Sequence, residues 1–310
     1  MTASIGSPLL WLSFLGFVLV MLALDLGVFH RKAHDITLRE ASLWTAVWVA
    51  LAGVFSVGVY WLFGPERALE FTTGYLIEKA LSIDNIFVFV LVFGAFSIPS
   101  AQQHRVLFWG ILGALAMRAA FIFAGGAFLA RFHWAIYLFG ALLAFTGLKM
   151  LVTKETAIDP NANPLVRLAR RFIPVKAEDT SRFFLRENGV LHATPLFLAL
   201  VAVEATDLVF AVDSIPAIFA ITQDPFIVFT SNIFAILGLR SLYFMLAGVL
   251  GKFHLLKPGL ALVLIFVGLK MSLVEVYKVP IGVSLAVIAL LIGGAVVGSL
   301  LFPKREAALA

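Results

Sequence analysis

The sequence predicts an all-α polytopic membrane protein with about nine transmembrane helices, and three observations carry this prediction. Of the 310 residues, 62% are hydrophobic and 13% are charged, whereas a soluble domain usually carries about 25% charged residues. The apolar residues fall in blocks of about 20 or more, the length needed to cross a hydrocarbon core about 30 Å thick. The strict alternation of polar and apolar residues that marks a transmembrane barrel is absent. We therefore expect one transmembrane domain over residues 1–310.

The first block has no basic residue before it and no small-residue cleavage site after it, so we interpret it as a retained helix and not as a signal peptide. Backbone groups in lipid must be satisfied within the chain, which favours a helix for every block. The nine predicted spans lie near residues 8–29, 40–63, 68–96, 105–129, 133–152, 193–221, 226–250, 258–275 and 280–302.

The distribution of basic residues predicts the orientation of these spans. When the connections are assigned alternately to two sides, fifteen Lys and Arg residues fall on one side and three, Arg67, Arg131 and Lys278, fall on the other. Basic residues accumulate on the cytoplasmic side of a membrane. We therefore expect a bacterial inner (plasma) membrane protein with its N-terminus outside and its C-terminus in the cytoplasm.

Residues 153–192 form the one long polar connection and are predicted to be a cytoplasmic loop. Two interpretations of its basic stretch "NPLVRLARRFIPV" stay open. The stretch is either an ordinary loop that obeys the orientation rule, or a short amphipathic helix that lies on the anionic inner leaflet.

An internal repeat relates the two halves of the chain. "RAAFIFAGGAFLARFH", from Arg118, resembles "RSLYFMLAGVLGKFH", from Arg240, and "FTGLKM" resembles "FVGLKM". Asp84 in "SIDNIFVF" aligns with Asp207 in "ATDLVFAV". The first unit, residues 68–152, holds spans 3–5, and the second, residues 193–275, holds spans 6–8. Three spans per unit is an odd number, so the units enter the membrane from opposite faces, as in the inverted repeats of secondary transporters.

Five acidic residues lie inside the first spans of the two units, two in the first unit and three in the second, where burial of a charge is costly. They are Glu78, Asp84, Glu204, Asp207 and Asp213. Glu204 and Asp207 are three residues apart and share a helix face. On an unbroken helix Asp213 points about 180° away from Glu204. Pro216 lacks an N–H group and clashes with the preceding turn, so we expect the helix to open there and to turn Asp213 back towards the other acids.

Charge balance makes these acids candidates for an ion pathway. Arg118 and Arg240 are expected to neutralise carboxylates or to hold the units together, and not to bind substrate. Even with Lys79, three central bases cannot neutralise five acids. Protons or a multivalent cation must neutralise the rest. The chain has no cysteine, so a metal here would have oxygen or imidazole ligands, and all-oxygen sites suit Mg²⁺, Ca²⁺ and Mn²⁺. Competition between metal and protons would give cation/proton exchange.

The acidic segments also resemble a known family. "EKALSIDNIFVF" (78–89), "VEATDLVFAVDSIPAIFAITQDPFIVFTSNIFAILGLRSLYF" (203–244) and "GLKM" (268–271) are similar to the TerC/Alx family, whose members are associated with tellurium resistance and, for Alx-like members, with Mn²⁺ export and alkaline pH. The resemblance implies a relation to LysE-like exporters. It also implies that the ion site is formed by Glu78, Asp84, Glu204, Asp207 and Asp213.

The sequence thus predicts a transporter that exports a divalent cation, with Mn²⁺ favoured by the resemblance, in exchange for protons. Two other functions stay open, a membrane-protein assembly partner, as plastid relatives imply, and an exporter of another small cation or an amino acid. No HExxH or GxGD motif supports an enzyme. We expect the bilayer, the cation and protons as partners, no nucleic acid and no tightly bound cofactor, and the sequence names no protein partner.

Overall fold

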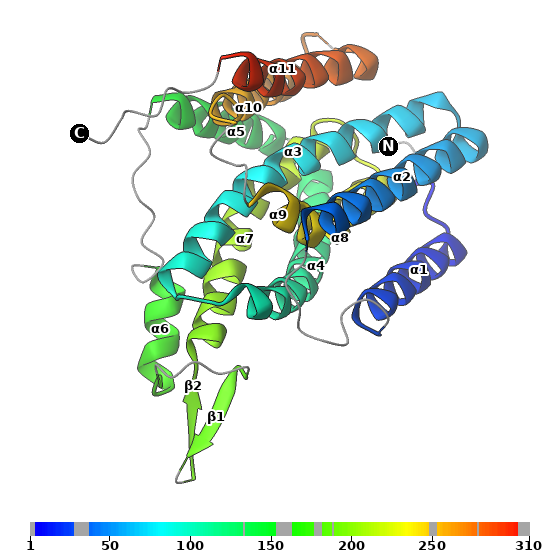
Figure 1. Ribbon diagram of the computed structural model, residues 1–310. Coiled ribbons are helices and arrows are strands. Elements are labelled where there is room, and N and C mark those ends of the chain that lie inside the picture. The colour runs from blue at the N-terminus through cyan, green and yellow to red at the C-terminus, as the bar shows by residue number, and fades with distance from the viewer. Residues whose placement is uncertain are drawn as a thin grey trace.

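The computed structural model describes residues 4–27, 37–132, 134–152, 163–176, 182–187, 189–247, 253–277 and 279–302. These residues form eleven helices and one short hairpin (Figure 1). The helices are α1 (Pro8–Gly27), α2 (Leu38–Phe63), α3 (Pro65–Ala95), α4 (Ser100–Arg131), α5 (Ala135–Val152), α6 (Pro164–Phe172), α7 (Pro195–Phe219), α8 (Pro225–Leu237), α9 (Leu239–Leu246), α10 (Leu256–Ser272) and α11 (Ile281–Leu301). The strands β1 (Phe184–Glu187) and β2 (Val190–Ala193) pair antiparallel.

A recurring cap and proline pattern sets where several helices begin. α6, α7 and α8 follow Asn163, Thr194 and Asp224, and each has proline as its first residue. The side chain of each cap accepts a hydrogen bond from a backbone N–H in the first turn. Such a cap satisfies a donor that the helix leaves free, and proline costs nothing at a position whose N–H has no partner.

Helices α3, α4, α7 and α8 pack against one another at the centre of the molecule. α2 packs on α3 and α9, and α11 packs on α10 and α3. Figure 1 shows α5, α10 and α11 gathered at one side, and α1 and α2 at another. The two larger apolar cores lie around this centre, and the one that includes Phe93 and Leu196 extends towards the hairpin side. The central four helices therefore position any site that is shielded from lipid.

Only some of the predicted spans are long and apolar enough in the structure to cross a membrane. Within the described residues, five helices are long and apolar enough to cross a membrane, or six if α8 and α9 count as one span bent by 40°. The five are α2, α4, α5, α7 and α11. α1 and α10 fall short in apolar length, and α3 carries charged residues through its middle. The chain is thus a multi-pass, mostly helical membrane protein, and nine spans stay a prediction.

The connection between residues 153 and 192 is more structured than a plain loop. α6 forms where one of the two interpretations places an amphipathic helix, and it packs against α7 through Val166. The short hairpin β1–β2 departs from the all-α prediction. Gly189 has a φ of 82° in the turn, a conformation that glycine adopts without steric cost. Residues 153–162 and 177–181 of this connection lie outside the described residues.

α5 and α10, the last helices of the two predicted units, make reciprocal contacts. A Cβ added to Gly147 of α5 would lie 2.6 Å from the carbonyl oxygen of Ala261, and one added to Gly268 of α10 would lie 2.6 Å from that of Gly140. Gly147 and Gly268 are equivalent in the repeat, and the same offset of 121 residues relates Gly140 to Ala261. Small residues allow helix backbones to approach this closely in membranes. The reciprocity agrees with an inverted repeat, which itself stays a prediction.

The prediction that α7 opens at Pro216 is wrong. α7 continues through Pro216 and ends at Phe219. The proline lies in the last turn of α7, and only three helical residues follow it. The break in the second unit instead falls at Gly238, between α8 and α9. Asp213 is therefore not turned back towards Glu204 and Asp207 in the middle of α7.

Candidate functional site

A buried arginine joins the two halves of the chain. Arg118 of α4 is 1% exposed and forms ion pairs with Glu78 of α3 and Asp207 of α7. Its Nη1 donates to Glu78 Oε1, and its Nη2 lies 3.1 Å from Asp207 Oδ1. Glu78 is fully buried, and Asp207 is 4% exposed. The prediction that Arg118 neutralises carboxylates is confirmed, and its two partners come from different predicted units.

Neutral side chains complete this cluster. Arg118 Nη1 also donates to Asn232 Oδ1 of α8, at 2.9 Å, and Asn232 Nδ2 donates to Glu78 Oε2 at 3.2 Å. Ser214 Oγ accepts a further bond from Arg118 Nη1, at 3.3 Å. On the other carboxylate, Asn85 Nδ2 lies 3.4 Å from Asp207 Oδ1. We call these six residues, Glu78, Asn85, Arg118, Asp207, Ser214 and Asn232, the central cluster.

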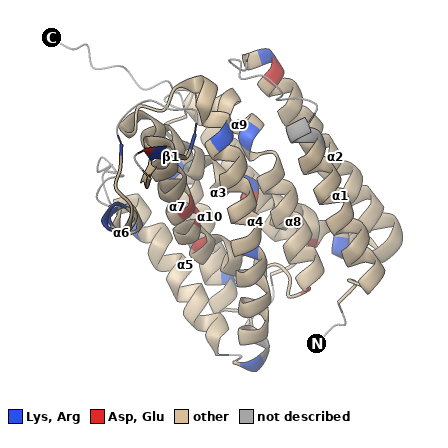
Figure 2. Ribbon diagram, turned by 90° about the horizontal axis from the view of Figure 1, so that it is seen from below, with Lys and Arg blue, Asp and Glu red and all other residues tan. Residues whose placement is uncertain are grey.

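The central cluster carries an imbalance of charge. Two carboxylates face one guanidinium, which leaves one formal negative charge when all three groups are ionised. A buried ion pair is tolerated only when its geometry and hydrogen bonds offset the loss of hydration. Figure 2 shows charged residues as isolated segments among mostly uncharged helices, with a basic group on α6. The cluster is thus a local concentration of charge inside the helix bundle.

Glu204 lies beside the central cluster but is not bonded to it. It is half-buried one turn before Asp207, on the same side of α7. Its carboxylate lies directly against Gly113 of α4, where an added Cβ would overlap it. Within the part of the chain that the structure describes, Glu204 has no hydrogen-bond or ion-pair partner. It is therefore an unpaired acid close to an unbalanced cluster.

Asp213 faces a different helix. Its Oδ1 accepts a hydrogen bond of 3.2 Å from Thr146 Oγ1 of α5. The side chain is half-buried, between the exposed Val212 and the buried Ser214. The unbroken α7 thus directs Asp213 towards α5 and away from Asp207.

The five predicted ligands are consequently not gathered in one place. Glu78 and Asp207 meet at Arg118, Glu204 lies next to them, and Asp213 lies against α5. Asp84 belongs to α3, but its side chain lies outside the described residues. Among the described residues, no three His, Asp or Glu side chains are grouped closely enough to hold a metal ion. In this conformation, the arginine occupies the position between the two central acids.

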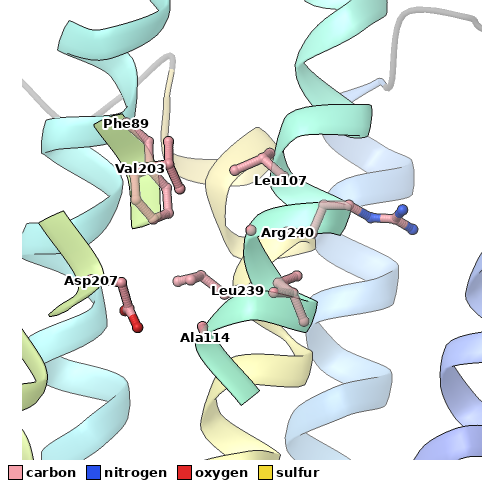
Figure 3. A pocket seen from close by; sticks show the side chains of 9 residues that line it. Phe89, Leu107, Ala114, Val203, Asp207, Leu239 and Arg240 are labelled. Carbon is pink, nitrogen blue, oxygen red and sulfur yellow. The ribbon is translucent and has the colours of Figure 1, made fainter. Parts of the chain in front are cut away.

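The other two central bases have other surroundings. Lys79 Nζ donates to the carbonyl oxygen of Ala235, at 3.3 Å, near the end of α8. The negative end of the helix dipole stabilises a cation at this place. Arg240 is 6% exposed and lines a small cavity between α3, α4, α7 and α9. In Figure 3, Asp207 lies on one side of this cavity, and the guanidinium of Arg240 points away from it on the other.

Sequence reasoning underrated one member of the cluster. Asn232 is only a weak candidate by sequence, because a single amide in an apolar span is a common feature. The structure gives it two hydrogen bonds, one to each side of the Arg118–Glu78 pair. The available signal was the run of polar residues Thr230, Ser231 and Asn232, which are all fully buried in an otherwise apolar helix.

Comparison with known proteins places the chain in a family. It matches the Integral membrane protein TerC family over residues 63–307. It is 60% identical to an uncharacterized membrane protein of Myxococcus xanthus over 299 residues, which cover 96% of this chain and 94% of that protein. It is 48% identical over 295 residues to an Escherichia coli protein named as a membrane-bound redox modulator, Alx, with 92% of each chain covered.

A more distant relative also matches over most of both chains. The chain is 41% identical over 278 residues to an uncharacterized membrane protein of Rickettsia bellii, which covers 89% of this chain and 92% of that protein. No solved structure matches the chain. The family match spans both acidic segments and both predicted repeat units, in agreement with the resemblance of those segments. The chain therefore belongs to the TerC family of integral membrane proteins.

Proposed function

We propose that this protein is a transporter that exports a divalent metal cation, with Mn²⁺ as the favoured substrate, in exchange for protons. The observation that supports this proposal is the meeting of Glu78 and Asp207, from the first helix of each predicted unit, on one buried arginine. A cluster with a residual formal negative charge, next to the unpaired Glu204, favours an additional positive charge. Ionisable groups in such places mark ion pathways in membrane proteins.

The chemistry of the cluster suits a hard divalent cation. The cluster contains the carboxylate oxygens of Glu78 and Asp207 and the neutral oxygens of Asn232 and Ser214, all of which face Arg118 in this structure. Hard cations such as Mg²⁺, Ca²⁺ and Mn²⁺ prefer oxygen ligands. The preference for Mn²⁺ within this group rests on the family resemblance alone. Asp84 is a further ligand in this proposal, and Asp213, which bonds to Thr146, joins the site only in another conformation.

Arg118 acts in this proposal as a tethered cation that competes with the substrate. Its guanidinium satisfies both central acids in the structure. For a metal ion to reach both carboxylates, Arg118 must release at least one of them. The same competition helps the ion to leave on the far side, because the guanidinium returns as the ion departs.

The inverted repeat supplies the motion in this proposal. Two three-helix units of opposite orientation rock against each other around a site at their interface in many secondary transporters. The reciprocal contacts of Gly147 and Gly268 support such a relation between the units. We further propose an inner-membrane location with the N-terminus outside, so that outward passage is export.

Transport by the purified protein in proteoliposomes tests the proposal. We expect Glu78→Gln and Asp207→Asn to abolish Mn²⁺ flux while the protein still folds. Glu70→Gln is the matched control, since Glu70 is a buried acid on the same helix that pairs with Arg67, at 2.7 Å, outside the cluster. Wild-type flux through folded Glu78→Gln and Asp207→Asn variants would refute the site.

The name of the Alx relatives suggests a second function, modulation of redox state. This chain has no cysteine, so its own side chains supply no thiol–disulfide exchange. A redox role would therefore act through a transported ion or through another protein. Proteoliposomes that contain only this chain separate the two functions, because a partner-dependent role predicts no Mn²⁺ flux in them.

A further inference from the structure

One face of α3 carries a line of polar side chains through the middle of the helix. Tyr75, Glu78, Ser82 and Asn85 are separated by three, four and three residues. This spacing places them within about 80° of one another around the helix, over about 15 Å of its length. Each is at most 7% exposed. We call these four residues the α3 polar stripe.

Three atoms of the α3 polar stripe lack hydrogen-bond partners. Within the described part of the chain, Tyr75 Oη, Ser82 Oγ and Asn85 Oδ1 are buried without a partner. Buried polar groups are almost always satisfied by protein or by ordered water. Three unsatisfied atoms along one helix face, on both sides of the buried Glu78, therefore indicate that something polar binds there.

Other hydroxyl groups on helices of the bundle show which local hydrogen bond Ser82 could form. The hydroxyls of Thr73, Thr206 and Thr230 each donate to the carbonyl four residues earlier, at 2.7–2.8 Å. Ser82 has the same option on α3 but makes no such bond. Its oxygen is thus left available, although a local hydrogen bond would satisfy it at little cost.

The α3 polar stripe leads to the small cavity beside Asp207. Phe89 follows Asn85 by one turn on the same helix face and lines this cavity together with Asp207 and Val203 (Figure 3). The cavity has room for about one water molecule. It lies towards the hairpin side, where α3 ends and α7 begins. The cavity is lined mainly by apolar side chains, and Asp207 is the acid at its edge. Polar atoms thus continue from Tyr75, past the central cluster, to Asp207 beside this cavity.

We propose that the α3 polar stripe is the hydrated path of the transported cation, with Ser82 and Asn85 as oxygen ligands between the cavity and Glu78. This inference rests on the proposed function and extends it to residues outside the acidic set. A hard divalent cation would enter at the cavity, contact Asp207 and Asn85 together, pass Ser82 to Glu78, and leave past Tyr75. Oxygen atoms about one turn apart let the ion exchange one ligand for the next, so that no single step strips it of all ligands.

The absence of cysteine from the chain gives a direct test. Ser82→Cys, Asn85→Cys and Tyr75→Cys are made one at a time in the full chain in proteoliposomes, and each is treated with a small, water-soluble cationic methanethiosulfonate. Thr73→Cys and Ala80→Cys are matched controls, since both residues are buried and lie about 160–180° around α3 from the middle of the stripe. Glu187→Cys, on the exposed hairpin, gives the rate for full exposure.

We expect the stripe variants to react at about 0.1–10% of the rate of Glu187→Cys, because a minor open conformation of a transporter is populated to that extent. The two controls should show no reaction above background. Equal reaction of stripe and control variants, or none in any stripe variant, would overturn the inference. Ser82→Cys preserves the size of the side chain, so it keeps the test valid if a larger change prevents folding.

Mn²⁺ separates this inference from the proposed function. If both hold, saturating Mn²⁺ slows the labelling of Ser82→Cys and Asn85→Cys and leaves that of Glu187→Cys unchanged. If the stripe is labelled and neither Mn²⁺ nor other divalent cations change the labelling rate, the stripe is a water path. That result contradicts divalent-cation transport through it. Flux of Mn²⁺ without any labelling of the stripe contradicts the path and leaves the transport function intact.

Discussion

Replacement of Arg118 by glutamine removes the one positive charge of the central cluster. Glu78 and Asp207 then lose an ion pair each, and Asn232 and Ser214 lose a hydrogen-bond donor. Removing one partner of a buried pair costs about 3–5 kcal/mol, because the remaining charge stays buried without compensation. We expect Arg118→Gln to lower the free energy of unfolding by about that amount, with the upper end favoured since two carboxylates are left.

A triple variant isolates the electrostatic cause. Arg118→Gln is combined with Glu78→Gln and Asp207→Asn, which removes all three charges and keeps similar side-chain volumes. Neutral replacements of a whole buried charge group are often close to neutral in stability, so the triple variant should recover most of the loss. Unfolding in detergent micelles, followed by the fluorescence of the six tryptophans, measures each free energy.

Two outcomes would refute this reasoning. The first is a loss for Arg118→Gln below about 1 kcal/mol, the range of an exposed ion pair. The second is a triple variant as unstable as Arg118→Gln alone, which would indicate lost packing and not unbalanced charge. Arg118→Lys adds a check, because a lysine is a single point charge and does not form the forked contact to both acids. It should fall between wild type and Arg118→Gln.

Three further predictions follow from close contacts and caps. Gly113→Ala should displace the carboxylate of Glu204 and slow Mn²⁺ flux as Glu204→Gln does, while Gly126→Ala on the same helix, whose Cβ would meet only ordinary contacts from 3.6 Å, should leave flux unchanged. Gly147→Ala should wedge α5 from α10 and lower the free energy of unfolding by about 1–3 kcal/mol, and an unchanged value would contradict the close packing. Asp224→Ala removes the N-cap of α8 and should cost about 0.5–2 kcal/mol in the same unfolding assay, with no loss arguing against the cap.

Much of the fold follows from local sequence, because the length of an apolar segment and the residue that caps a helix are both features of one continuous stretch of chain. Asn163, Thr194 and Asp224, each followed by proline, mark helix starts that the structure reproduces. The hairpin was missed because "FFLRENGVLHA" is short and charged. Its pairing depends on Gly189, which adopts a positive φ in the turn.

The site was harder to predict, because it depends on the direction in which side chains point across helices. Simple helix geometry directs Asp213 away from Glu204, and the structure agrees with that geometry. The added expectation of an open turn at Pro216 was wrong, because α7 continues through the proline and ends three residues later, at Phe219. Arg118 as a partner of acids was predictable from charge balance. That it reaches Glu78 and Asp207 together required the packing of α3, α4 and α7.

Mn²⁺ binding to the purified protein, followed by the loss of the electron paramagnetic resonance signal of free Mn²⁺, measures the central site directly. If Glu78 and Asp207 hold the ion in competition with Arg118, the wild-type chain binds Mn²⁺ and the double variant Glu78→Gln with Asp207→Asn does not. Arg118→Gln, with its competing guanidinium removed, should bind the ion more tightly than wild type wherever it stays folded. Equal Mn²⁺ binding by wild type and the folded double variant would contradict the assignment of this cluster as the ion site.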